Sequence, residues 1–346
     1  MKIGEHTMSR DEANSIPART WKAPTYEVTA AGKVIGGYTP TGVNNWGRWG
    51  ENDVLGTTNL ITPEIVANAA KLISTGRVIS MALPIGTDAP AWSGRPAPQH
   101  YFTMTGTDIV ASLSSPDDEP SVTFTDDYVT MAMHASTQWD SFAHWALDGV
   151  LYNGFWVGNV TAAGSRDLDI SQLKESLVGR GVLLDLPRLL GVDFMEPGTL
   201  VTPQMLDDAA AKEGVEIRSG DIVIIRTGHV ERWYTLETDA EREDWNARVP
   251  GVGRDTIAWL HAQDVGALVV DNPGCEVVPN ELPMTVPYPF HGGALVDLGL
   301  PLGELWSLGA IADACAADGV YEFFVSAPPL NLPGGVGSVI SPIAIK

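Results

Sequence analysis

The sequence predicts an α/β fold, in which helices cover a sheet of parallel strands. Apolar segments typical of buried strands alternate with helical segments in the second half of the chain. These apolar segments are rich in Val, Ile and Leu, as strands buried on both faces are. The 346 residues are 44% hydrophobic, which is enough for one large domain or two closely packed ones.

Helix caps, β-branched runs and turn residues define the elements in chain order. Residues 1–25 are polar and mixed, and we expect them to form a flexible arm. Thr202 and Pro203 provide the N-cap and first-turn proline that begin a helix. The expected helices cover 63–74, 203–214 and 254–263. The expected strands cover 77–83, 99–106, 179–189, 219–229 and 266–274, with a last strand and a Gly-rich loop within 320–338. A loop is expected at 86–98 and an acidic surface turn at 114–121.

Charge and cysteine content narrow the class of protein. The net charge is −22, from 43 acidic and 21 basic residues, which argues against a nucleic-acid partner. Cys275 and Cys315 form no C-x-x-C pair, so the reducing cytoplasm is the expected location. The first residues lack the apolar run of a signal peptide. No stretch approaches about 20 continuous apolar residues, so we expect neither a transmembrane helix nor a membrane partner.

Four groups suited to metal binding or proton transfer gather in the segment 131–153. They are His134, Gln138, Asp140 and His144. The residues before His134 are typical of a strand, and on an extended backbone even offsets point to one face. His134, Gln138 and Asp140 differ by even numbers, so an extended backbone would place all three together. Imidazole and carboxylate are common ligands of zinc, manganese and iron.

The same spacing also occurs on a solvated strand edge, where such residues bind nothing. The neighbours of the four polar groups argue against that alternative, because they are large and apolar. They are Met131, Met133, Trp139, Phe142 and Trp145. Polar groups buried in such surroundings need partners, since leaving one unpaired costs about 1–3 kcal/mol.

The segment HASTQWDSFAH, residues 134–144, resembles the signature of the metal-dependent cyclase family of hydrolases. That family includes bacterial kynurenine formamidases and isatin hydrolases, and its usual motif is H-x-G-T-H-x-D-x-P-x-H. The resemblance implies that His134 and Asp140 bind a metal and that His144 is the acid/base. It also implies a swivelling β/β/α fold, with a central mixed sheet and flanking helices in a single domain over 26–346. The likeness extends from about Trp46 to the C-terminus.

The motif departs from the usual pattern at three positions. Gln138 replaces the second ligand histidine, and Ser136 and Phe142 replace the Gly and Pro. A Gln carbonyl is a harder and weaker ligand than imidazole, which favours manganese or magnesium over zinc. Alternatively, Gln138 hydrogen-bonds the substrate or stabilises the oxyanion instead of binding metal. A longer subgroup of the family is similar to this chain in having Gln at this place.

The resemblance also implies ligands downstream of the motif. His291 and Glu304 are isolated polar residues in apolar segments, and they match the His and Glu that complete the family's metal site. An aromatic substrate would need a flat pocket wall, although core packing is the alternative for each tryptophan. The candidate substrate-binding residues are Trp139, Trp145, Trp46, Trp49 and, at the start of a strand, His100.

We therefore expect a hydrolase that opens an amide, a cyclic amide or a lactone, with Mn²⁺ or Zn²⁺ as cofactor. Two alternatives stay open: a cyclase or lyase that uses the same metal on a biosynthetic intermediate, and a non-catalytic protein that binds a metabolite. The expected partner is a small-molecule substrate. The resemblance further implies a homodimer or homotetramer.

Overall fold

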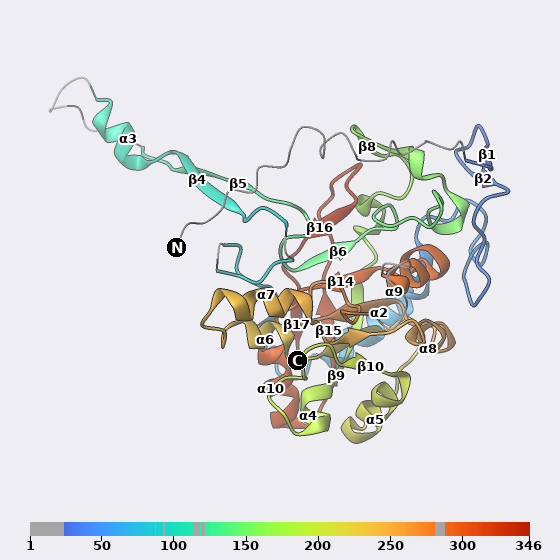
Figure 1. Cartoon of the computed structure of the whole chain (residues 1–346). Helices are drawn as coiled ribbons and strands as arrows, with labels where there is room; N and C mark the ends of the chain where they lie inside the picture. Colours follow the sequence, from blue (N-terminus) through green and yellow to red (C-terminus); the bar gives the residue numbers. More distant parts are fainter. Residues whose placement is uncertain (1–23, 87, 93, 114–117, 119–121, 281–287) are drawn as a thin grey trace, which may run out of the picture.

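The computed structural model describes residues 24–346 apart from 87, 93, 114–117, 119–121 and 281–287 (Figure 1). The expected arm at 1–25 therefore lies almost entirely outside the described residues, and so does most of the acidic turn expected at 114–121.

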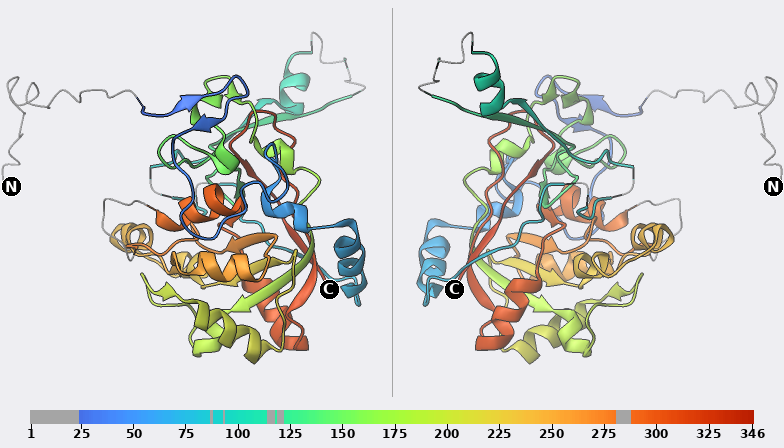
Figure 2. Two further views of the ribbon diagram at one scale, coloured as in Figure 1. Left: turned by 90° about the vertical axis from the view of Figure 1, so that its right-hand side faces the viewer. Right: turned by 90° about the vertical axis from the view of Figure 1, so that its left-hand side faces the viewer.

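A nine-stranded mixed sheet forms the centre of the described part of the chain (Figures 1 and 2). Its order is β16-β6-β14-β13-β11-β9-β15-β17-β3, and the strands from β14 to β9 run parallel to one another. The outer strands pair antiparallel. The bounds are β3 Val78–Ser80, β6 Gln138–Asp140, β9 Val178–Asp185, β11 Ile222–Arg226, β13 Ala267–Val270, β14 Leu302–Glu304, β15 Glu322–Ser326, β16 Gly337–Val339 and β17 Ile343–Ile345. This sheet and its flanking helices confirm the expected fold class.

The parallel strands form where continuous apolar runs can be covered on both faces. In β11, Val223 pairs with Val182 of β9 and with Leu268 of β13, and all three side chains are fully buried. Each such side chain contributes about 1.5–3 kcal/mol relative to an exposed one. The strands expected at 179–189, 219–229 and 266–274 are therefore all present, although each is shorter than expected.

Helices that pack on this sheet include α2 (Pro63–Ala69) and α5 (Pro203–Glu213), both of which contact β9. Helix α5 begins and ends as its sequence indicates: the Thr202 hydroxyl accepts from the Met205 amide, and Gly214 terminates the helix in the left-handed conformation. The expected helix at 254–263 is α8, Thr256–Ala262. The helix expected at 63–74 is wrong at its end, because α2 gives way to the 3₁₀ turn η2, Ala70–Leu72.

Two expected strands are too long at their carboxyl ends, because helices begin there. Strand β9 ends at Asp185, whose carboxylate accepts from the Arg188 amide and starts α4, Leu186–Leu190. An apolar segment with proline in the first turn of a short helix is easily mistaken for the end of a strand. Strand β11 likewise ends at Arg226, and α6 (His229–Trp233) follows.

Several further elements complete the body of the molecule. The helices are α7 Asp239–Ala247, α9 Pro289–His291, the π-helix η6 Gly292–Leu298 and α10 Gly309–Asp318. The 3₁₀ turns are η1 Gly56–Leu60, η3 Tyr152–Gly154, η4 Val157–Asn159 and η5 Ile170–Leu173. The small strands are β1 Glu27–Val28, β2 Val34–Ile35, β7 Val160–Thr161, β8 Gly164–Ser165, β10 Leu200–Val201 and β12 Gly251–Val252.

A long hairpin projects from the body, and Figures 1 and 2 both show it standing clear of the sheet. It consists of β4 (Gln99–Met104), α3 (Gly106–Ala111) and β5 (Asp126–Thr130). Every residue of β4 and β5 is exposed. Among the described residues, no helix combines the length and apolar character needed to cross a bilayer.

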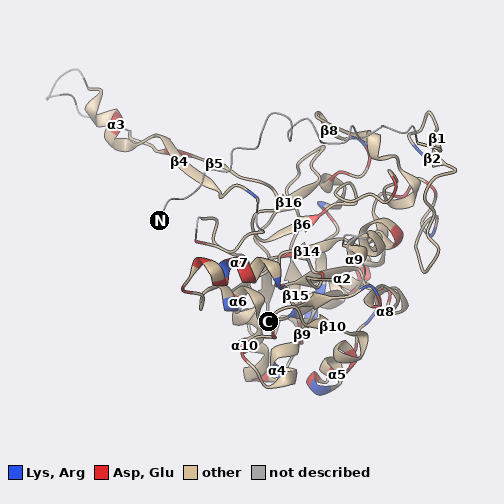
Figure 3. Cartoon of the chain, in the orientation of Figure 1, with Lys and Arg blue, Asp and Glu red and all other residues tan. Residues whose placement is uncertain are grey.

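Acidic residues are spread along the ribbon, and basic residues are fewer (Figure 3). The pattern agrees with the net charge of −22.

Candidate active site

The motif residues meet where a turn enters β6. His134 lies in the turn, while Gln138 and Asp140 begin and end the strand. The extended backbone expected from His134 onward is therefore wrong before Gln138. Even so, His134 Nε2 lies 3.3 Å from Asp140 Oδ1, because the turn folds the imidazole back over the strand. Gly337 of β16 makes room for this ring, since a Cβ at that position would overlap His134 Nε2.

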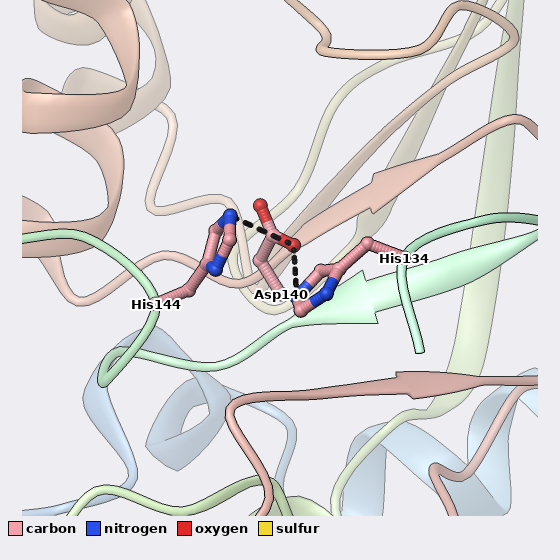
Figure 4. A group of neighbouring side chains, drawn as sticks. All are labelled: His134, Asp140 and His144. Atoms are coloured by element: carbon pink, nitrogen blue, oxygen red, sulfur yellow. Dashed lines mark ion pairs between the residues drawn. The ribbon is translucent and has the colours of Figure 1, made fainter. Parts of the chain in front are cut away.

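His144 approaches the same carboxylate from the following loop. Its Nε2 lies 4.0 Å from Asp140 Oδ1, and its ring stacks on that of His134 with 4.2 Å between centroids. Figure 4 shows the Asp140 carboxylate facing both imidazoles, with a contact drawn to each. The side chain of His144 is 25% exposed and that of His134 is 11% exposed, so His144 has more access to a ligand.

Strand pairing brings Glu304 to the motif. In the antiparallel β6–β14 ladder Glu304 lies directly opposite Gln138, and Gln138 Nε2 donates to Glu304 Oε2 over 2.5 Å. His291, at the end of α9, places Nε2 3.4 Å from Glu304 Oε1. The structure therefore brings His134, Gln138, Asp140 and these two downstream residues into one buried cluster.

Glu276 orients His291, and sequence reasoning missed it. Its carboxylate accepts from the backbone amides of Phe290 (3.0 Å) and His291 (3.3 Å), and it lies 3.0 Å from His291 Nδ1. A carboxylate that fixes one imidazole nitrogen so that the other points to a metal is a recurrent arrangement. The available signal was an isolated Glu in an apolar run, which is the pattern that singled out Glu304.

Buried atoms that lack hydrogen-bond partners converge in this cluster. Within the described part of the chain these atoms include His134 Nε2, Gln138 Oε1, Asp140 Oδ1 and Oδ2, and Glu304 Oε1. Leaving such groups unpaired costs about 1–3 kcal/mol each. Two sets have ligand atoms within 4.8 Å of one another: His134, Asp140 and His144; and Asp140, His291 and Glu304. Nitrogen and oxygen donors of this kind fit a divalent cation.

The electrostatics of the cluster also favour a cation. Burial raises the pKa of Asp140 and lowers the pKa of His134 to about 4. Burial alone would lower the pKa of His291, but the neighbouring carboxylates of Glu276 and Glu304 outweigh it and raise that pKa to about 10. The buried carboxylates thus attract compensating positive charge, which a divalent ion supplies without protonating the imidazole.

A cavity of about 240 Å³ opens onto this cluster. Three large rings form its walls and meet edge to face: the centroids of Trp92 and Tyr288 are 6.0 Å apart, and those of Trp145 and Tyr288 are 5.6 Å apart. Apart from these rings, the cavity is lined by Arg95, His144, Pro273, Gly274, His291 and Glu304. Sequence reasoning selected Trp145 for such a wall but missed Trp92, Tyr288 and Arg95.

The structure does not bring the other candidate tryptophans to this cavity. Trp139 is fully buried in the core, where its Nε1 donates to the Ala327 carbonyl. The Nε1 of Trp46 donates to the Val296 carbonyl, and its ring lines a different cavity of about 690 Å³. Trp49 stacks under the Arg48 guanidinium, 4.8 Å away. Trp139 and Trp46 thus pack in or against the core, which is the alternative that the sequence left open.

His100 also lies apart from the cluster. It is on the projecting strand β4, where its Nε2 pairs with Asp127 Oδ2 across the hairpin at 2.5 Å. Its side chain is 48% exposed. Within one chain, the structure therefore does not place His100 at the cavity.

The fold and the cluster together define a class of protein: an α/β protein in which His, Asp and Glu side chains suited to bind a metal ion gather at strands β6 and β14 of a mixed sheet. The Cyclase family model matches residues 79–277, which is more than half of the chain. The chain therefore belongs to the Cyclase family, as its motif indicated. No functionally curated protein matches it.

Solved structures agree with this assignment. A crystal structure described as that of a novel cyclase is 40% identical to the chain, with a TM-score of 0.81, and the match covers 88% of this chain and 98% of that one. Isatin hydrolase A from Labrenzia aggregata is 16% identical, with a TM-score of 0.54 and coverage of 78% and 93%. The Ralstonia solanacearum enzyme is 17% identical, with a TM-score of 0.55 and coverage of 82% and 97%. The two isatin hydrolases share the fold.

Proposed function

We propose that this protein is a metal-dependent hydrolase that opens an amide, a cyclic amide or a lactone. The observation that carries the proposal is the convergence of unpartnered, buried ligand-type atoms from His134, Gln138, Asp140 and Glu304. Membership of the Cyclase family and the isatin hydrolase activity named for two proteins of the same fold support the reaction class.

His134, Asp140, His291 and Glu304 would hold the divalent ion. Gln138 has its amide nitrogen committed to Glu304, so its free carbonyl oxygen, Oε1, is the atom left for the metal. An oxygen ligand in place of imidazole favours Mn²⁺ over Zn²⁺. A divalent ion supplies Lewis acidity, which activates water and polarises a carbonyl.

His144 would move the proton in the reaction. It lies on the cavity side of the cluster and makes contact with Asp140 and the His134 ring, which fix its orientation. An imidazole can accept a proton from water and return it to the leaving group near neutral pH. The hydrogen bond that Gln138 Nε2 donates to Glu304 Oε2 also holds the Glu304 carboxylate, so Gln138 would bind the ion through Oε1 and support Glu304 through Nε2.

Metal content per chain, measured by plasma mass spectrometry on protein purified without chelator, tests the proposal. We expect about one equivalent of manganese or zinc, followed by turnover in a screen of lactones, cyclic imides and aryl formamides. A protein that stays empty after titration with both ions would refute the metal site. Incorporation of ¹⁸O from labelled water separates hydrolysis from ring closure or elimination.

We also propose a small-molecule substrate, a cytoplasmic location and a homodimer or homotetramer. Two observations support these points. The cysteines Cys275 and Cys315 are free and buried, as in proteins of a reducing compartment. The hairpin exposes apolar side chains such as Phe102, Phe124 and Tyr128, which a second subunit could cover. Light scattering coupled to size exclusion measures the subunit number.

A further inference from the structure

The cavity that opens onto the cluster of His134, Asp140, His291 and Glu304 has one arginine and no lysine among its described lining residues, and that arginine is Arg95. The other lining residues include three aromatic rings and Glu304, and the carboxylates of Asp140 and Glu276 are buried in the adjoining cluster. In a chain with a net charge of −22, a cation at this place is a specific feature of the site and not part of a general basic surface.

The Arg95 guanidinium is held in place but is not neutralised. One of its nitrogens donates to the His134 carbonyl oxygen, which ties the group to the turn that carries a proposed ligand. Among the described residues, Arg95 has no carboxylate within ion-pair distance. A guanidinium has five N–H donors, and this bond uses one of them. A half-buried arginine with spare donors and no counter-ion is suited to bind an anion.

The rings around Arg95 select the shape of that anion. Trp92, Trp145 and Tyr288 form edge-to-face pairs and line the cavity, so a flat aromatic ring would find faces and edges against which it packs favourably. The cavity of about 240 Å³ is smaller than the ~300–1,000 Å³ usual for drug-sized ligands, so the ligand is small. A planar carboxylate matches the fork of a guanidinium with two parallel hydrogen bonds.

We infer that Arg95 is a specificity-determining residue that binds a carboxylate carried by a small, planar, aromatic substrate. As a statement about substrate, the inference rests on the proposed hydrolase function. The carboxylate in question is a fixed group of the substrate, separate from the amide or ester bond that is opened. Arg95 therefore makes the site prefer aryl acids to neutral rings of the same shape.

Titration of the purified full chain, supplied with Mn²⁺, tests the inference through tryptophan fluorescence and without turnover. The probes are benzoate and its neutral isostere benzamide. Hydrogen bonds to a charged group contribute about 1.5–3 kcal/mol, so wild type should bind benzoate roughly 10- to 100-fold more tightly than benzamide. Arg95→Gln should remove this preference and leave benzamide binding unchanged, while Arg95→Lys keeps part of it. Arg248→Gln, at an exposed arginine outside the cavity, is the matched control.

Three results would overturn the inference: equal binding of the two probes by wild type, an unchanged benzoate preference in Arg95→Gln, or equal loss of both probes in that variant. The last result would mean that Arg95 only anchors the His134 turn. The metal content of each protein is measured in parallel. A full complement of metal without a benzoate preference defeats this inference alone, whereas an Arg95-dependent preference in a protein that takes up no metal defeats the proposed function alone.

Discussion

Replacing Glu276 with Gln should weaken metal binding while leaving the fold intact. The Glu276 carboxylate is 1% exposed and holds His291 through Nδ1 and the backbone amide. Glutamine keeps the size of the side chain but loses its charge, and its NH₂ cannot accept a hydrogen bond. The one remaining oxygen is uncharged and must serve two backbone amides as well as His291 Nδ1, so the bond that directs His291 Nε2 toward Glu304 Oε1, 3.4 Å away, is weakened.

The expected loss of metal affinity is about 10- to 100-fold, as is typical when the carboxylate partner of a ligating imidazole is altered. That range corresponds to about 1.4–2.7 kcal/mol. The folding free energy without metal should fall by less than the ~3 kcal/mol expected for a strong hydrogen bond to a charged group, because removing one of three clustered carboxylates also relieves repulsion.

Competition with a chelating dye for Mn²⁺ and Zn²⁺ measures the affinity directly, and thermal unfolding in EDTA reports the stability of the metal-free chain. Glu243→Gln, on the exposed side of α7, is the matched control. If Glu276→Gln is folded and binds metal within twofold of wild type, then Glu276 does not position His291 for metal binding.

Four other outcomes follow from the same geometry. His144→Ala should keep its metal but lose at least about 100-fold in turnover. His100→Ala, the control on the hairpin, should keep both its metal and its turnover, and an active His144→Ala would remove the proton-transfer role. Gly337→Ala should displace the His134 ring and lower metal affinity, measured by the same dye competition, and unchanged affinity would contradict the packing described. EDTA should lower the melting temperature of wild type, and an unchanged melting temperature in EDTA would contradict the presence of a bound ion. Burial lowers the pKa of His229 to about 3, below the ~6.5 of an unfolded chain, so stability is full above pH 6.5 and declines as the pH falls. At pH 5 this costs about 2 kcal/mol, and urea unfolding of His229→Phe should show a pH 7-to-5 difference smaller by that amount; an equal difference would refute the assignment.

Local patterns predicted the parts of the structure that depend on local physics. The apolar runs around Val182, Val223 and Leu268 are buried strands because a continuous hydrophobic segment needs cover on both faces. The N-cap at Thr202 and the terminating Gly214 predicted the bounds of α5 to within one residue. Strand ends were harder, because Asp185 functions as a helix cap only when the following backbone turns.

The rest of the site depends on contacts between residues far apart in the chain, which local sequence patterns do not predict. Glu276 reaches His291 across 15 residues, and Gln138 reaches Glu304 across 166. Arg95 could not be assigned to the cavity, because its loop has no periodic pattern from which to place the side chain. The tryptophans were candidates for the wall of a binding pocket because they are large and flat, but the sequence does not show which of them reach the pocket. Only the fold decides that Trp145 faces the cavity while Trp139 packs in the core.

The pairing of β6 with β14 has a consequence for how the protein acquires its ion. The proposed ligands come from segments that synthesis delivers at very different times, and Glu304 is the last of them. A growing chain that has released only the 134–144 motif has too few ligands to form the site. Because the Glu304 carboxylate arrives opposite Gln138 only when the strands are in register, metal capture should follow assembly of the sheet and should not nucleate it. Refolding started with or without Mn²⁺ should then proceed at one rate, while unfolding slows when the ion is present.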